Sequence, residues 1–199
     1  MRIALSVPML FLFAVIWMST ACAEDRATIL VVYHSMQGHT RLMAEAVARG
    51  ARGVDHADVK ILTVGKATKE DVLSADAIIV GSPVENANVA PEVMSFINGW
   101  PFEGSPLRDR IGAAFVTGGG ISAGEELTQL NILHSMLIFG MVVVGGPECN
   151  SAFGASGITV ESPFGQNGTG KDLAEQFQKK GEALGKRVAE LAVKWKRNR

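Results

Sequence analysis

Cysteine and excess charge are both scarce in this 199-residue chain, and each shortage excludes a class of protein. Cys22 and Cys149 are the only cysteines, too few for a fold held together by a framework of disulfides. The 19 lysines and arginines nearly balance the 20 aspartates and glutamates, and a net charge of −1 gives no indication of nucleic acid or an anionic surface as a partner. The length suits one domain of ordinary size, with ample apolar material for a core.

One long apolar run lies at the N-terminus, between residues 3 and 18. Arg2 precedes the run and a stretch of small residues ending at Ala23 follows it, which is the order found in a secretory signal peptide. We therefore expect residues 1–23 to be a signal peptide and residues 24–199 to be a single domain. The protein is then exported, to the periplasm or to the outside of the cell.

A second interpretation of the same segment is a lipoprotein signal, in which Cys22 becomes an acylated first residue. Such a lipid anchor would be the protein's only expected contact with a membrane. Under either interpretation Cys149 has no partner within the chain. A lone cysteine after a strand is usually a packing residue, so we expect Cys149 to be packed.

Short apolar runs predict five strands, at residues 29–33, 58–64, 77–81, 111–116 and 141–144. Helical stretches separate them, opening near residue 40 and covering 68–75, 91–97, 125–138 and 173–195. Residues 145–170 are rich in Gly, Ser, Pro and Asn and predict a long loop. Strands that alternate with helices indicate an α/β fold, a parallel sheet with helices on both faces.

Three loops are expected to meet at one edge of this sheet, over residues 34–40, 82–90 and 117–124. Right-handed crossovers place the carboxyl ends of all parallel strands on the same edge, and each of these loops follows a strand. In doubly wound sheets the ligand binds at that edge, where the strand order reverses. The three loops are therefore the candidate binding site.

The first of these loops has the features of a phosphate-binding turn. It joins a buried strand to a helix, so backbone N–H groups and the positive end of the helix dipole coincide there. The hydroxyls of Ser35 and Thr40 add uncharged donors. Neither the Lys-Ser/Thr pair of nucleotide-hydrolysing loops nor a Gly-x-Gly-x-x-Gly run is present, so we expect a phosphate monoester that stays intact.

A phosphate at the first loop and two more loops beside it fit a mononucleotide with a planar head group. The alternative is that residues 34–40 form only a tight strand-to-helix turn. Trp100 has two interpretations as well: it covers an edge of the ligand ring, or it simply packs against Pro101 and Phe102.

Several short motifs, in this order and spacing, resemble the WrbA-type branch of the flavodoxin-like proteins, and the resemblance covers about residues 27–195. They are Tyr33-x-Ser-Met-x-Gly-His39, Gly81-Ser-Pro83 with Asn88, Gly118-Gly-Gly120 with Glu125, Gly140-Met-Val-Val-Val144 and Ser162-Pro-Phe-Gly165. The resemblance implies a flavodoxin-like doubly wound sheet of five parallel strands in the order 2-1-3-4-5. It also implies non-covalent FMN, and hydride transfer from NAD(P)H through the flavin to a quinone.

Carried over by position, the FMN phosphate would be held by Ser35, Met36, Gln37, Gly38, His39 and Thr40. The isoalloxazine ring would be bordered by Pro83, Val84, Glu85, Asn86, Ala87 and Asn88. Its other edge would be approached by the backbone of Thr117, Gly118, Gly119 and Gly120. We expect no metal-binding residue.

The chain departs from the family pattern at two places that bear on activity. Glu85 and Asn86 stand where the family has an Arg-Phe pair, which should weaken affinity for a phosphorylated, anionic nicotinamide cofactor. Ile138 and Phe139 occupy positions where a histidine is common. His134 lies one helical turn earlier and is the candidate catalytic residue in its place.

A third departure concerns assembly. The family's insertion between the second and third strands, linked to tetramers, is missing, because residues 64–71 are too few to contain it. A homo-oligomer remains compatible with the sequence.

Two other functions also stay open. The protein could be a flavodoxin-type carrier of single electrons, although its third loop lacks the tyrosine that stacks on the flavin in carriers and Tyr33 is its only tyrosine. It could also be a non-catalytic module that uses the fold for binding.

Overall fold

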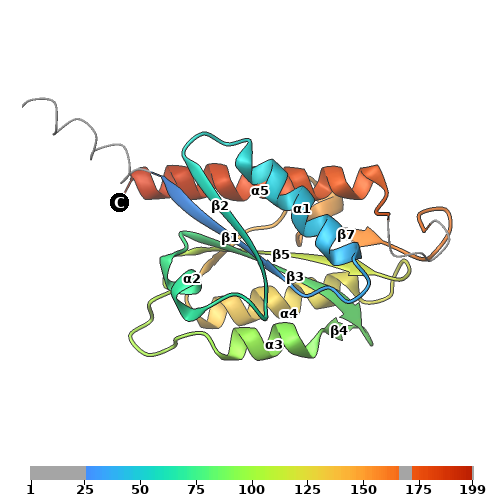
Figure 1. Ribbon diagram of the computed structural model, residues 1–199, viewed down its shortest axis with the longest axis horizontal. Helices are drawn as coiled ribbons and strands as arrows, with labels where there is room; N and C mark the ends of the chain where they lie inside the picture. Colours follow the sequence, from blue (N-terminus) through green and yellow to red (C-terminus); the bar gives the residue numbers. More distant parts are fainter. Residues whose placement is uncertain (1–25, 166–171, 199) are drawn as a thin grey trace, which may run out of the picture.

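The computed structural model describes residues 26–165 and 172–198, which form a three-layered α/β structure (Figure 1). In chain order the elements are β1 (Ala27–Tyr33), α1 (His39–Arg52), β2 (Ala57–Thr63), α2 (Lys69–Ser74), β3 (Ala77–Glu85), β4 (Asn88–Val89), α3 (Pro91–Asn98), β5 (Ile111–Gly118), α4 (Glu125–Ile138), β6 (Val142–Val143), the 3₁₀ turn η1 (Cys149–Ser151), β7 (Ala155–Ile158) and α5 (Glu175–Arg197). The predicted signal peptide lies outside the described residues. Among the helices of these described residues, none combines the length and the apolar character of a membrane-spanning segment.

The sheet has the strand order β2-β1-β3-β5-β6, and the pairs along this path are parallel. This confirms the predicted order 2-1-3-4-5, with β5 and β6 as the fourth and fifth strands. The position beyond β5 is shared, however, because β6 pairs with the start of β5 and β7 pairs with its end. The prediction of a loop throughout 145–170 was therefore wrong at Ala155–Ile158.

Side chains alternate between the two faces of the sheet, as expected for buried strands. Ile29 and Val31 of β1 pack in the cluster that lies under α1 and α5. Leu30 and Val32 pack in the opposite cluster, with residues of α2, α3 and α4. Helices therefore cover both faces (Figure 1), and the carboxyl ends of β1, β3 and β5 meet at one edge.

β3 continues further than its apolar run predicted. The strand extends to Glu85 and returns through a two-residue turn into β4, where 82–90 had been predicted as an irregular loop. Asn86 and Ala87 form that turn with φ of 49° and 60°, the pair of positive values that a tight hairpin of type I′ requires. The hairpin gives the second loop of the site a regular backbone.

Two hydrogen bonds of the backbone tie the neighbouring elements to β3. The Ala90 N–H, just before α3, donates to Ser82 Oγ at 3.0 Å. The His34 N–H, just after β1, donates to the Gly81 carbonyl oxygen at 3.1 Å. The segments that surround the end of β3 are therefore fixed against one another.

Candidate functional site

A cavity of about 270 Å³ lies at the edge of the sheet where the three predicted loops meet. Its lining includes residues of all three loops and of the segment that follows β7. The lining residues are Ser35, Met36, Gln37, His39, Thr40, Pro83, Val84, Glu85, Thr117, Gly118, Gly119, Thr159 and Val160.

The first loop is wound around the hydroxyl of Ser35. Ser35 Oγ accepts hydrogen bonds from the N–H of Gly38 at 3.1 Å and from the N–H of Arg41 at 3.3 Å. Gly38 has φ of 100°, in the left-handed region that glycine adopts without steric cost, and it caps the N-terminus of α1. Because Ser35 Oγ acts as the acceptor in both bonds, its own O–H remains able to donate to a ligand.

A pair of buried hydroxyls joins the first loop to the third. Thr40 Oγ1 and Thr117 Oγ1 lie 2.8 Å apart, and the two residues are 2% and 5% exposed. One hydrogen bond uses only one of the two protons, so the second O–H can point to a ligand in the cavity. The site thus has uncharged donors on two of its elements.

The cavity contains no permanent positive charge. None of the described residues that line it is a lysine or an arginine, and Arg41 next to it pairs with Glu45 at 3.1 Å. Burial lowers the pKa of His39 below its ordinary value, against a smaller opposing effect of Asp172. The lowered pKa favours the neutral form of His39, and an anion here would be held by N–H groups, hydroxyls and the α1 dipole.

The second and third loops form walls that face the same cavity. Pro83 and Val84 supply apolar surface, and Glu85 supplies the only carboxylate among the described lining residues. On the other wall, a Cβ added to Gly118 would lie 3.1 Å from Glu125 Cγ and 3.5 Å from Val84 Cγ2. Glycine at this position therefore leaves room where the two walls approach each other.

Five residues predicted to bind the cofactor do not line the cavity: Gly38, Asn86, Ala87, Asn88 and Gly120. Gly38 shapes the first turn, Asn86 and Ala87 form the hairpin turn, and Asn88 lies in β4. A Cβ on Gly120 would meet a carboxylate oxygen of Glu161 at 2.8 Å, so this glycine approaches the 159–165 segment instead.

The candidate catalytic residue His134 is exposed in the second half of α4. It is not among the residues that line the cavity, so the structure does not bring it together with the three loops. Its role stays a prediction without support from this geometry.

Thr159 and Val160 line the cavity although sequence reasoning missed them. Thr159 Oγ1 donates to the Gly118 carbonyl oxygen at 3.0 Å, and the Val160 N–H donates to that of Gly119 at 3.1 Å. These bonds continue the pairing of β7 with β5 into the third loop. Val160 is 58% exposed, which makes it an apolar residue presented to solvent beside the site.

The structure also tests the predictions made for Cys149 and Trp100. Cys149 is exposed in η1, so the prediction that it is packed was wrong. Trp100 is buried and does not line the cavity, which supports the packing interpretation, but its ring neighbours are Phe96 and Phe139, with centroids 5.8 and 5.4 Å away, where Pro101 and Phe102 were predicted.

Comparisons of the sequence identify a family and two relatives. Residues 55–156 match the family described as NADPH-dependent FMN reductase. A protein named flavodoxin from Aquifex aeolicus is 32% identical over 167 residues, which cover 81% of this chain and 85% of that protein. A protein named NAD(P)H dehydrogenase (quinone) from Azorhizobium caulinodans is 32% identical over 163 residues, covering 70% of this chain and 81% of that protein.

Comparison of the structure gives the same fold. A WrbA-like flavodoxin from Agrobacterium tumefaciens matches with a TM-score of 0.70 at 20% identity, over 84% of this chain and 98% of that one. A flavodoxin from the Archaea matches with a TM-score of 0.63 at 22% identity, over 83% of this chain and 98% of that one. The chain therefore belongs to the NADPH-dependent FMN reductase family and has the flavodoxin-like fold.

Proposed function

We propose that this FMN-binding flavodoxin-like oxidoreductase takes two electrons as a hydride from NAD(P)H and delivers them to a quinone or a similar small acceptor. The observation that carries the proposal is the cavity of about 270 Å³ where hydroxyl donors, a helix N-terminus and two close walls come together. The relative from Azorhizobium caulinodans, whose name specifies a quinone, supports this choice of acceptor.

The first loop fits the phosphate of FMN. It offers the O–H of Ser35, one free proton of the Thr40 and Thr117 pair, and the backbone N–H groups at the start of α1. The first N–H groups of a helix have no partner within the helix, so they can donate to phosphate oxygens. The described lining contains no lysine or arginine, so these uncharged donors alone would hold the dianion.

The two walls fit a planar ring. Pro83 and Val84 on one side, and Gly118 and Gly119 on the other, present apolar surface and bare backbone at which a flat group can lie. The electron chemistry is supplied by the isoalloxazine ring of FMN when it is bound. Pro83, Val84, Gly118 and Gly119 would border that ring and fix its orientation.

Glu85 places a negative charge on the wall beside the proposed ring. A carboxylate there repels additional phosphate groups of an approaching cofactor, although solvent screens the effect. We therefore propose that NADH is a better reductant than NADPH for this protein.

We also propose that residues 1–23 direct export, because they have the order of a signal peptide. A lipid anchor on Cys22 and a homo-oligomer stay predictions from the sequence.

The test is an anaerobic reduction of the purified, FMN-loaded protein. Addition of NADH should bleach the flavin absorbance, and subsequent addition of a quinone should restore it without dioxygen. Free FMN at the same concentration is the control for non-enzymatic reduction. Absence of bleaching over minutes would reject the hydride reaction and leave the single-electron carrier, which the name of the Aquifex aeolicus relative favours.

A further inference from the structure

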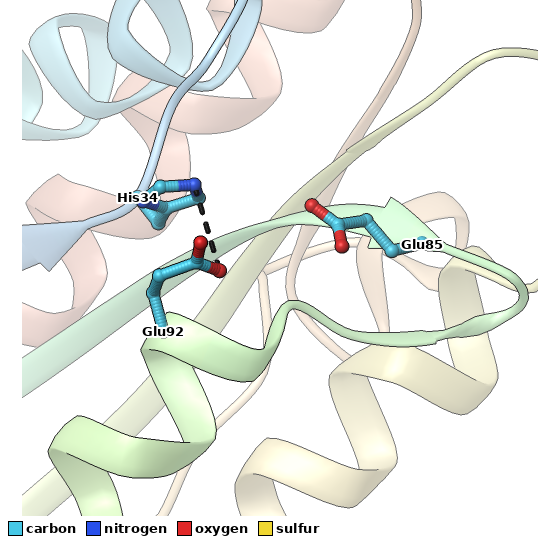
Figure 2. Close-up of side chains that lie close together, drawn as sticks. All are labelled: His34, Glu85 and Glu92. Carbon is cyan, nitrogen blue, oxygen red and sulfur yellow. Dashed lines mark ion pairs between the residues drawn. The ribbon is translucent and has the colours of Figure 1, made fainter.

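Three potential metal ligands lie together at the border of the proposed FMN site (Figure 2). His34 follows β1, Glu85 ends β3, and Glu92 is in the first turn of α3. One ligand atom from each of the three lies within 4.8 Å of the other two. Figure 2 shows the three side chains pointing toward a common region, with His34 Nε2 and Glu92 Oε2 3.7 Å apart.

The imidazole of His34 lacks a partner that its position calls for. Among the described residues, none forms a hydrogen bond with its buried Nε2 atom, and Glu92 Oε2 at 3.7 Å is too distant for one. A buried polar atom without a partner costs free energy, of the order of 1–3 kcal/mol, and is rare in native proteins. A cation bound to Nε2 would remove this cost.

The two carboxylates beside His34 also lack a counter-charge. Across residues 26–165 and 172–198, neither Glu85 nor Glu92 has a lysine or arginine within ion-pair distance, and Glu92 contacts only His34 in this way. Two negative charges at close range repel each other, and a divalent cation between them offsets both. The charge balance of the cluster therefore favours a metal ion.

The backbone that carries the three ligands is already fixed. His34 donates its N–H to the Gly81 carbonyl oxygen at 3.1 Å, and Glu85 pairs with Asn88 in the hairpin. The start of α3, which carries Glu92, is tied to β3 by the bond between the Ala90 N–H and Ser82 Oγ. A set of ligands held on rigid elements loses little conformational entropy when it binds a metal.

We propose that His34, Glu85 and Glu92 bind a divalent transition-metal ion, with Zn²⁺ as the best match. One imidazole nitrogen and two carboxylate oxygens suit Zn²⁺, which is bound at about 2.0–2.2 Å in tetrahedral sites, with ligand atoms about 3.3 Å apart. The present spacing is wider than this, so the side chains have to move closer on binding, and Glu92, which is 52% exposed, has room to rotate. Three protein ligands leave one position for water or for an oxygen of a small ligand.

The three ligands lie at the border between two cavities. Glu85 lines the proposed FMN cavity, while His34 and Glu92 line a second cavity of about 740 Å³ beside α3. A bound ion would neutralise the carboxylate that faces the FMN cavity, so the repulsion of NADPH proposed above belongs to the metal-free protein. The ion would also hold the tip of β3 to α3. This inference concerns metal binding by the chain and stands whether or not the proposed redox function is correct.

The experiment is a calorimetric titration of ZnCl₂ into tag-free protein that has been dialysed against a chelator and then against buffer. We expect one ion per chain, and no measurable binding of Mg²⁺, which prefers oxygen ligands and its own water. Titration with Co²⁺ should give the visible absorption of a tetrahedral complex. The substitutions His34→Gln, Glu85→Gln and Glu92→Gln should each weaken Zn²⁺ binding by about tenfold or more.

Glu126→Gln is the matched control, since Glu126 is an exposed carboxylate in the first turn of α4, as Glu92 is in that of α3. This variant should bind Zn²⁺ like the unchanged protein. Circular dichroism confirms that each variant is folded before titration. Absence of Zn²⁺ binding, or equal binding by the three ligand variants and the control, overturns the proposal.

Discussion

Replacement of Thr40 by valine removes one hydroxyl from the cavity and keeps the shape of the side chain. Thr40 Oγ1 lies 2.8 Å from Thr117 Oγ1, and both residues are almost fully buried. In the proposed complex Thr117 donates to Thr40, and Thr40 donates to the phosphate. Thr40→Val therefore removes a hydrogen bond to a charged group, worth about 1.5–3 kcal/mol.

That free energy corresponds to a loss of about 10- to 150-fold in affinity for FMN. The assay is quenching of flavin fluorescence during titration of the protein into FMN, repeated with riboflavin. Riboflavin has the same ring and lacks the phosphate, so its affinity should not change. The comparison separates the phosphate contact from any general damage to the site.

Thr28→Val is the matched control, because Thr28 lies near the start of β1, at the opposite edge of the sheet. This variant should bind FMN like the unchanged protein. Equal losses for FMN and riboflavin in Thr40→Val would refute the assignment of the first loop to the phosphate, and so would undiminished binding of both.

Three further predictions concern packing, charge and substrate choice. A Cβ added to Gly185 of α5 would lie 1.9 Å from a backbone oxygen of α1. Gly185→Ala should therefore destabilise the fold by about 3 kcal/mol and lower Tm by roughly 6–12 °C. Gly65→Ala is the control and should leave Tm unchanged, because nothing lies within 4 Å of a Cβ at that position. Lys60 and the backbone of Thr68 lower the pKa of Asp71, so its stabilisation is complete above the ordinary pKa of 3.8 and disappears as the pH falls through the lower folded value. Asp71→Asn should therefore flatten the decline of Tm below about pH 4, and an unchanged decline would contradict this. Glu85→Gln, assayed with a chelator present to exclude metal effects, should lower KM for NADPH by roughly two- to fivefold and change KM for NADH less. Equal changes in both KM values would argue against repulsion between Glu85 and the additional phosphate of NADPH.

The sequence predicted the fold well wherever burial produced a clear pattern. The run Ile29–Tyr33 is buried on both faces, so only a strand in the middle of the sheet could accommodate it. The Thr68–Asp71 pair predicted the start of α2, and the structure has both bonds of a capping box there. Strand order followed from the family resemblance and is confirmed by the pairing of β2, β1, β3 and β5.

Elements without such a pattern escaped prediction. β7 has the sequence Ala-Ser-Gly-Ile, which is too short and too small in its side chains to show an alternation. Its pairing with β5 nevertheless brings Thr159 and Val160 to the site. The extension of β3 was hidden by Pro83, a residue uncommon within strands.

The cluster of His34, Glu85 and Glu92 shows a different limit. His34 lies about fifty residues before Glu85 and Glu92, and the three meet because the strand order places β1 beside β3 and the hairpin returns to α3. No local spacing encodes this arrangement. The site also includes two continuous segments, Ser35–Thr40 and Thr117–Gly119. These were correctly expected to lie together, because each follows a strand of the parallel sheet and the carboxyl ends of such strands share one edge.

In the proposed complex, an uncharged turn at the head of α1 holds the phosphate of FMN as a dianion. Phosphorus NMR of the FMN complex between pH 5 and 8 tests it directly, because a free phosphate monoester changes its charge near pH 6. Donors that stabilise the dianion should hold the resonance of bound FMN constant across this range. A bound resonance that shifts with pH in the same way as free FMN would show that the turn does not stabilise the dianion.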